Sequence, residues 1–180
     1  MYTIYKEFHF SYGHRVWTQS LNAELSLDTA CVCKHLHGHN STVKVYLEAN
    51  ELVNGFVTDF KHLNWFKKWV DDVLDHKMVM DINDPALTLV FPKLTDVYNS
   101  LSKAPGEQYC LVSPEVFKKI ESIHERELYE GLVVVDFVPT SELLANWMFK
   151  KVKEKMEPFG IKVKKIEFTE TPKTQSTYEE

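Results

Sequence analysis

Three stretches of the chain alternate between hydrophobic and polar residues, which is the period of a β-strand with one buried face. The first ends near residue 14, the second lies within residues 39–50, and the third spans residues 161–171. A fourth stretch, "GLVVVDFV", is apolar almost throughout and also predicts a strand. The positions expected to share a face are Phe8, Phe10, Tyr12 and His14, then Val43, Val45 and Leu47, then Ile166, Phe168 and Glu170.

Two further stretches have the hydrophobic period of an amphipathic helix. The first, "FKHLNWFKKWVDDVL", follows Asp59, whose side chain can cap the helix. The second, "PTSELLANWMFKKVKEKM", predicts a helix that begins near Thr140. The apolar stripe of the first helix is Phe60, Leu63, Phe66, Val70, Val73 and Leu74.

The pattern between about residues 81 and 131 is irregular. Thr95 and Ser113 are predicted to be N-caps of short helices, and the polar tail from Pro172 is expected to fray. The order strand, strand, helix, irregular insert, strand, helix, strand favours an α+β fold. We therefore expect residues 1–180 to form a single domain, an antiparallel sheet with two main helices on one face and an insert at about 81–131.

Composition and charge narrow the classes of function. The chain is 44% hydrophobic and 26% charged, and its net charge of −5 without a long basic run argues against nucleic acid as a partner. No apolar run approaches the roughly 20 residues that span a bilayer. The start "MYTIYKEFHF" is too polar for a signal peptide, and the cysteine count is odd. We expect a cytoplasmic protein with reduced thiols and no membrane contact.

The run "CVCKHLHGHN" concentrates metal-seeking side chains. Strand side chains at positions i and i+2 face the same way about 6.6–7 Å apart, so His37 and His39 can share one ion. His14, at the end of the first predicted strand, is the best candidate for a third ligand. Three neutral imidazoles with an open position form the catalytic type of zinc site. A closed zinc finger of Cys31, Cys33 and the last two histidines is disfavoured, because finger ligands come in separated pairs.

Six motifs, "HFSYGHR", "CKHLHGHN", "GFVTDF", "LDH", "PTSE" and "FTET", occur in this order. Over residues 1–80 and 132–171 the chain resembles the 6-pyruvoyl-tetrahydropterin synthase family, and more closely its bacterial 6-carboxy-tetrahydropterin synthase branch. The resemblance implies the tunnelling fold (T-fold), in which subunits join their sheets into a barrel. It also implies a homo-oligomer, most often a hexamer, with active sites between subunits. Open sheet edges in one subunit agree with such pairing.

The same resemblance implies roles for individual residues. The zinc ligands correspond to the three histidines named above, and the proton-abstracting cysteine corresponds to Cys33 through the spacing C-x3-HGH. His76, preceded by Asp75, and Glu170 correspond to the charge-relay positions, and Glu170 also corresponds to the pterin anchor. Cys31 satisfies the longer spacing, C-x5-HGH, of the animal pyruvoyl synthases, so both spacings occur in this chain.

Basic residues flank these motifs. Arg15 and Lys34 can meet a triphosphate, although such residues are often only solvated. His35 is either a neighbour of the triphosphate or a surface residue. The alternative for Cys31 is a small buried residue, and for Glu170 a surface charge at a strand end.

The implied function is a zinc-dependent lyase that converts 7,8-dihydroneopterin triphosphate to 6-carboxy-tetrahydropterin, acetaldehyde and triphosphate. A bound Zn²⁺ would acidify carbon–hydrogen bonds beside the ligated hydroxyls, and a thiol near a cation ionises more readily. The alternatives are a 6-pyruvoyl-tetrahydropterin synthase, which eliminates triphosphate without cleaving the side chain, and a non-catalytic zinc-binding relative.

Overall fold

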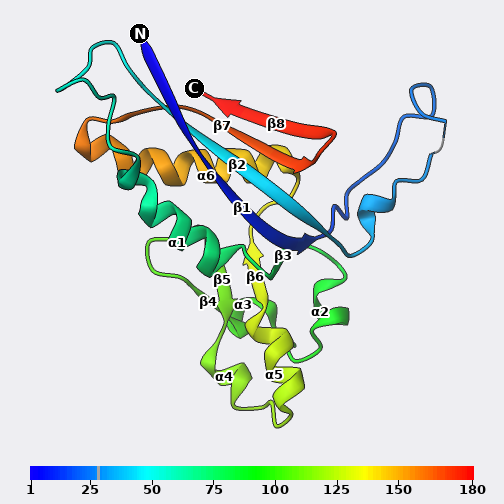
Figure 1. Cartoon of the computed structure of the whole chain (residues 1–180). Helices are drawn as coiled ribbons and strands as arrows, with labels where there is room; N and C mark the ends of the chain where they lie inside the picture. Colours follow the sequence, from blue (N-terminus) through cyan, green and yellow to red (C-terminus); the bar gives the residue numbers. More distant parts are fainter. Residues whose placement is uncertain (28) are drawn as a thin grey trace. The chain divides into compact units, whose positions relative to one another are not determined.

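The computed structural model describes residues 1–27 and 29–180, and Figure 1 shows the arrangement of their strands and helices. The hydrogen-bonded order of the strands is β4-β5-β6-β3-β1-β2-β7-β8. The strands are β1 (Tyr2–His14), β2 (His37–Ala49), β3 (Lys77–Asp81), β4 (Leu101–Lys103), β5 (Tyr109–Val112), β6 (Leu132–Val135), β7 (Lys162–Thr171) and β8 (Thr174–Glu179). The α-helices are α1 (Asn64–Val73), α2 (Leu87–Val90), α3 (Val97–Ser100), α4 (Pro114–Phe117), α5 (Ile123–Glu130) and α6 (Ser141–Met156), and 3₁₀ helices span Val32–Lys34, Phe60–Leu63 and Glu157–Phe159.

The chain divides into two units. Unit 1 consists of residues 1–11, 39–75 and 140–180, and unit 2 consists of residues 12–38 and 76–139. Strand β1 and its partner β2 contribute residues to both units.

In unit 1, the two long helices α1 and α6 pack on one face of the sheet, as the hydrophobic pattern predicted. Phe66 of α1 contacts Phe8 of β1, with ring centroids 5.2 Å apart, and Trp69 of α1 contacts Trp147 of α6 at 5.0 Å. The alternating positions predicted to be buried are inaccessible to solvent on β2 and β7: Val43, Val45, Leu47, Ile166 and Phe168. This core anchors the strands that carry His39 and Glu170.

Unit 2 has its own core, built largely from the segment that the sequence left irregular. Strand β3 pairs with β1 and with β6, and both pairings are parallel, whereas β4–β5 and β5–β6 are antiparallel. The sheet is therefore mostly antiparallel, as predicted, but parallel around β3. The buried residues of this core are Met80, Leu87, Phe91, Leu94, Val112, Val116, Ile120, Tyr129, Leu132 and Val134.

The helix predicted from residue 60 begins with a 3₁₀ turn. The Asp59 side chain accepts a hydrogen bond from the Lys61 backbone N–H at 2.7 Å, so its predicted role as a cap is confirmed. Phe60 is nevertheless 49% exposed, because a 3₁₀ turn has three residues per turn and breaks the predicted stripe. Thr140 caps α6 as predicted, with its hydroxyl accepting from the Leu143 N–H.

Two local predictions were wrong. The N-cap of α3 is Asp96 and not Thr95, since the Asp96 carboxylate accepts the Asn99 N–H. The tail after Pro172 does not fray but forms β8, which pairs antiparallel with β7. Tyr178 of β8 packs on Phe149 of α6, with ring centroids 5.1 Å apart, and this contact stabilises a segment that looked too polar to fold.

Candidate metal centre and its surroundings

Three histidines meet where β1 ends and β2 begins. Each of His14, His37 and His39 offers a ring nitrogen, and these nitrogens lie within 4.8 Å of one another. Gly38 lets the start of β2 lie close to the backbone of β1, because a Cβ atom at this position would be 3.1 Å from the Tyr12 carbonyl oxygen. The ring centroids of His14 and His37 are 4.5 Å apart, and His14 is almost fully buried. The predicted trio therefore forms a group that can bind a metal ion.

The hydrogen bonds of two of these rings define their tautomers. His14 Nδ1 lies 2.6 Å from the Pro139 carbonyl oxygen, and His37 Nδ1 lies 2.7 Å from the His35 carbonyl oxygen. A carbonyl only accepts, so each Nδ1 carries the hydrogen and each Nε2 presents its lone pair. Such backbone acceptors commonly orient metal-binding histidines. The donor set thus fits a divalent ion that accepts imidazole ligands, such as Zn²⁺.

Glu170 lies next to this group. Its Oε1 is 3.8 Å from His39 Nε2, and both side chains are mostly buried. Its backbone carbonyl accepts a hydrogen bond from the Ser41 hydroxyl at 3.2 Å. Glu170 follows the buried positions Ile166 and Phe168 on β7, which explains why it points inward and not into solvent.

The cysteine-rich run does not continue as a strand. Residues 32–34 form a 3₁₀ helix, and the strand starts only at His37, so the backbone changes direction between Cys33 and the histidines. The carbonyl of Cys33 accepts a hydrogen bond from the Val16 N–H at 2.8 Å, two residues beyond His14. This bond attaches the predicted base to the end of β1. Cys31 and Cys33 are both half-buried.

The two basic residues predicted to meet a triphosphate have different surroundings. Lys34 is exposed in the 3₁₀ helix. Arg15 forms an ion pair with Asp84, with 3.2 Å between Nε and Oδ2, and its side chain is 22% exposed whereas that of Asp84 is inaccessible. Sequence reasoning missed Asp84, because nothing in the sequence links it to a residue 69 positions earlier.

Asp75 and His76 lie in the turn between α1 and β3. Asp75 Oδ1 accepts the Ser11 backbone N–H at 2.8 Å, which attaches the turn to β1. His76 has a φ of 58°, in the left-handed region that few residues other than glycine adopt. Backbone strain of this kind often accompanies functional sites. Their predicted roles in proton transfer stay predictions.

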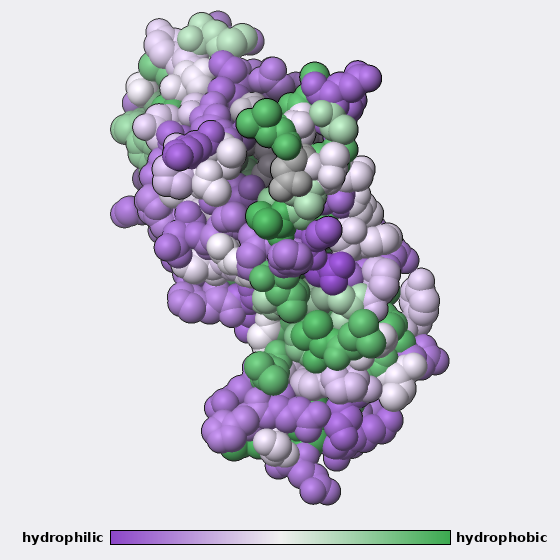
Figure 2. All heavy atoms as spheres, turned by 90° about the vertical axis from the view of Figure 1, so that its right-hand side faces the viewer, coloured by the Kyte–Doolittle hydropathy of each residue, from purple (hydrophilic) through white to green (hydrophobic). Residues whose placement is uncertain are grey.

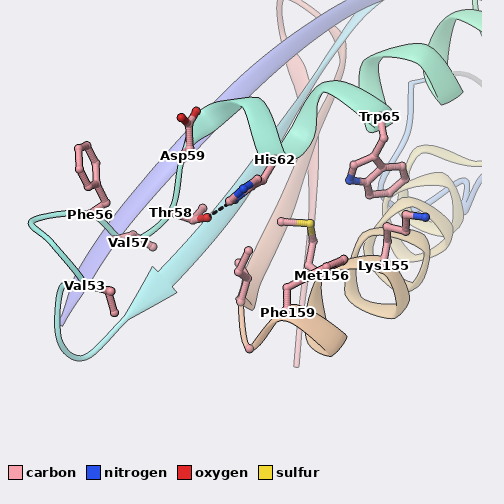
Figure 3. Close-up of a pocket in the computed structure, with 12 residues that line it drawn as sticks. Val53, Phe56, Val57, Thr58, Asp59, His62, Trp65, Lys155, Met156 and Phe159 are labelled. Carbon is pink, nitrogen blue, oxygen red and sulfur yellow. Dashed lines mark hydrogen bonds between the residues drawn. The ribbon is translucent and has the colours of Figure 1, made fainter.

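Unit 1 also contains a cavity of about 660 Å³ that shares no residue with the predicted site. Figure 3 shows the loop after β2, with Val53 and Phe56, on one side and Met156 and Phe159 on the other. His62 in the same cavity lies 2.6 Å from the Thr58 hydroxyl. The lining is mainly apolar.

Comparison with known proteins gives consistent matches along the chain. The sequence model of the 6-pyruvoyl tetrahydropterin synthase family matches residues 3–180. The 6-carboxy-5,6,7,8-tetrahydropterin synthase of Aquifex aeolicus is 28% identical, with 98% of this chain and 97% of the relative covered. The crystal structure of an uncharacterized protein from Wolinella succinogenes has a TM-score of 0.94 at 48% identity, covering 99% of this chain and 97% of that one.

A more distant likeness concerns the fold alone. The structure of Caenorhabditis elegans 6-pyruvoyl tetrahydropterin synthase has a TM-score of 0.53 at 24% identity and covers 99% of this chain and 95% of that one.

In the described part of this chain, no helix combines the length and the apolar character needed to cross a membrane.

Proposed function

Because the chain belongs to the 6-pyruvoyl tetrahydropterin synthase family, we propose that it is a zinc-dependent lyase acting on 7,8-dihydroneopterin triphosphate. The proposed products are 6-carboxy-5,6,7,8-tetrahydropterin, acetaldehyde and triphosphate, the reaction used in 7-deazaguanine and queuosine biosynthesis. The cluster of His14, His37 and His39 is the observation that carries this proposal. The similarity to the A. aeolicus relative over nearly the whole chain supports the carboxy product.

Different residues of the chain have different roles in the proposed reaction. A Zn²⁺ ion held by the three histidines would act as a Lewis acid toward the hydroxyls of the substrate side chain. Cys33 accepts the proton from the side-chain carbon, with His76 as its charge-relay partner, and Asp75 or Glu170 orients or charge-balances His76. Glu170 accepts two hydrogen bonds from the aminopyrimidine edge of the pterin. Arg15 and Lys34 bind the triphosphate.

The second candidate reaction is that of a 6-pyruvoyl-tetrahydropterin synthase. It is favoured by one observation, the position of Cys31, which has the longer spacing to His37. Both reactions use the same metal and need a base, but only the carboxy-forming reaction cleaves the side chain and releases acetaldehyde.

The test is mass-spectrometric product analysis after the zinc-loaded protein is incubated with 7,8-dihydroneopterin triphosphate. We expect 6-carboxy-tetrahydropterin and an equal amount of acetaldehyde. A pyruvoyl product without acetaldehyde would select the second candidate. Zinc binding without any pterin product would select a non-catalytic relative.

We also propose that the chain assembles into a homo-oligomer, a hexamer in keeping with the family resemblance. Strands β4 and β8 are the ends of the strand order, and unpaired edges favour pairing with another chain. Apolar side chains are exposed on several elements, including Leu89 of α2 at 80% and Phe56 at 63%, and Figure 2 shows apolar areas between hydrophilic ones on one face. We place the protein in the cytoplasm, in agreement with the lack of a disulfide among the described cysteines.

A further inference from the structure

Two buried carboxylates of unit 2 have no part in the proposed reaction. Asp81, the last residue of β3, and Asp84, three residues later, are 3% and 4% exposed. A buried carboxylate is costly unless its oxygens are bonded, so the partners of these two residues indicate what they do.

Three of the four carboxylate oxygens accept hydrogen bonds, and the fourth, Asp84 Oδ2, lies in an ion pair without a hydrogen bond. Asp81 Oδ2 accepts the Trp17 indole N–H at 2.9 Å, and its Oδ1 accepts the Asn83 backbone N–H at 2.9 Å. Asp84 Oδ2 pairs with Arg15 Nε at 3.2 Å, and its Oδ1 accepts the Ala86 N–H at 2.8 Å. Each carboxylate thus uses one oxygen to shape its own turn and the other to bind the segment that follows His14.

The residue between Arg15 and Trp17 connects this segment to the proposed base. Val16 is buried, and its backbone N–H donates to the Cys33 carbonyl oxygen at 2.8 Å. Arg15 and Trp17 therefore contact the two carboxylates, while Val16 between them bonds to the turn that carries Cys33. When Arg15 and Trp17 are held in place, the N–H of Val16 between them keeps its direction toward the Cys33 carbonyl.

We propose that Asp81 and Asp84 are positioning residues that hold Arg15–Trp17 rigid, so that Val16 fixes Cys33 in the site. The functional importance of Cys33 rests on the function proposed above, whereas the clamp itself does not. We call the contacts of Asp81 with Trp17 and of Asp84 with Arg15 the clamp.

The clamp is tested without substrate, by the rate at which iodoacetamide alkylates each cysteine of the full-length protein, resolved by peptide mass spectrometry. Trp17→Phe removes the donor, and Asp81→Asn removes the negative charge and leaves one acceptor oxygen for two donors, the Trp17 indole N–H and the Asn83 backbone N–H. We expect each to raise Cys33 alkylation about 10-fold or more, the change that loss of one charge-assisted hydrogen bond produces in a local opening equilibrium. The double variant should resemble the single ones, because both remove the same contact.

Cys110 is the internal control, because it packs against the core of the same unit. Its alkylation should stay at the parent rate in every variant. Asp96→Asn, a helix cap elsewhere in unit 2, should leave Cys33 unchanged, since asparagine also caps helices.

A parallel rise of Cys33 and Cys110 would mean that the variants only loosen the unit, and it would overturn the proposal. So would an unchanged Cys33, or additive effects in the double variant. If Asp81→Asn does not fold, Trp17→Phe decides alone.

The activity readout is kept separate. With active enzyme, we expect Trp17→Phe to lower kcat with little change in KM, because the indole N–H contacts the protein and not the substrate. If the parent makes no pterin product, the proposed function fails while the alkylation result still decides the clamp.

Discussion

His37 donates its Nδ1 hydrogen to the carbonyl oxygen of His35, 2.7 Å away, so the orientation of one candidate ligand depends on a neighbour's backbone and not on that neighbour's imidazole. A fourth histidine, His35, therefore lies beside the metal group of His14, His37 and His39 without needing to be a ligand itself.

This hydrogen bond predicts different zinc contents for two substitutions. His37→Ala should lose most of its zinc, because a three-imidazole site loses one ligand. His35→Ala should retain zinc, because alanine keeps the carbonyl that holds His37. Elemental analysis after extensive dialysis measures zinc per subunit. Full zinc retention in His37→Ala would remove His37 from the site.

The two cysteines of the same run should differ in their effect on catalysis. Cys33→Ala should keep the fold and the zinc but lower turnover by about 10²–10⁴, the usual contribution of a positioned acid or base. Cys31→Ala should stay close to the parent rate. Steady-state assays of acetaldehyde release compare the two variants. The reverse result would assign the base to Cys31 and favour the pyruvoyl reaction.

The ionisation of Tyr46 should depend on Glu167. Burial and the hydrogen bond that Tyr46 donates to Glu167 raise the pKa of Tyr46 to about 12. An unfolded tyrosine has a pKa of about 10, so this phenol contributes stability below about pH 10 that is lost as the pH rises toward 12. Glu167→Gln should lower the pKa of Tyr46, as measured by the ultraviolet absorbance of the phenolate. Tyr46→Phe identifies its transition among those of the other tyrosines, and an unchanged midpoint in Glu167→Gln would contradict the prediction.

The core of unit 1 should be sensitive to loss of volume at Phe168. This ring is fully buried and stacks on Phe10, with centroids 6.0 Å apart. Phe168→Ala should lower the free energy of unfolding by about 3–5 kcal/mol, from lost burial and the cavity left behind. Tyr98→Ala, at a side chain that is 75% exposed, should change it by less than about 0.5 kcal/mol. Urea denaturation of both variants measures the difference, and equal midpoints would contradict it.

The apolar rim of the unit 1 cavity should contribute to assembly. Phe56 and Phe159 are 63% and 73% exposed in one chain, which exposes much aromatic surface to water. Replacing both by serine should shift the oligomer toward smaller species in sedimentation velocity at micromolar concentration. A parent protein that is already monomeric would contradict the assembly proposal. Phe60→Ser, at an exposed aromatic residue outside the cavity lining, is the matched control.

The alternation of hydrophobic and polar residues and the helix-capping residues predicted those strands and helices that have one face in water. Val43, Val45 and Leu47 of β2 and the Thr140 cap of α6 are where the pattern placed them. Strand β3 was missed because its last residues are buried in succession, as is usual for a strand between two parallel neighbours, and no alternation marks it.

The candidate site was predictable where side chains carry the chemistry. The spacing of His37 and His39 and the position of His14 indicated the metal group directly. The carbonyls of His35 and Pro139 that orient two of the rings were not predictable, because a backbone acceptor leaves no trace in the sequence. Nor was the partner of Arg15, because long-range ion pairs depend on topology.

The parallel pairing of β3 with β6 also bears on how this protein can change over evolutionary time. The connection between them leaves at the end of one strand and returns at the start of the next, and loop-closure entropy grows only slowly with length. The exposed turn at Pro105 and Gly106, between β4 and β5, can therefore be lengthened or exchanged while the core of unit 2 stays in place and β3 keeps its register with β1, including the pair His14–Val79. The fold thus accepts new sequence at a turn whose length does not set the spacing of the metal ligands.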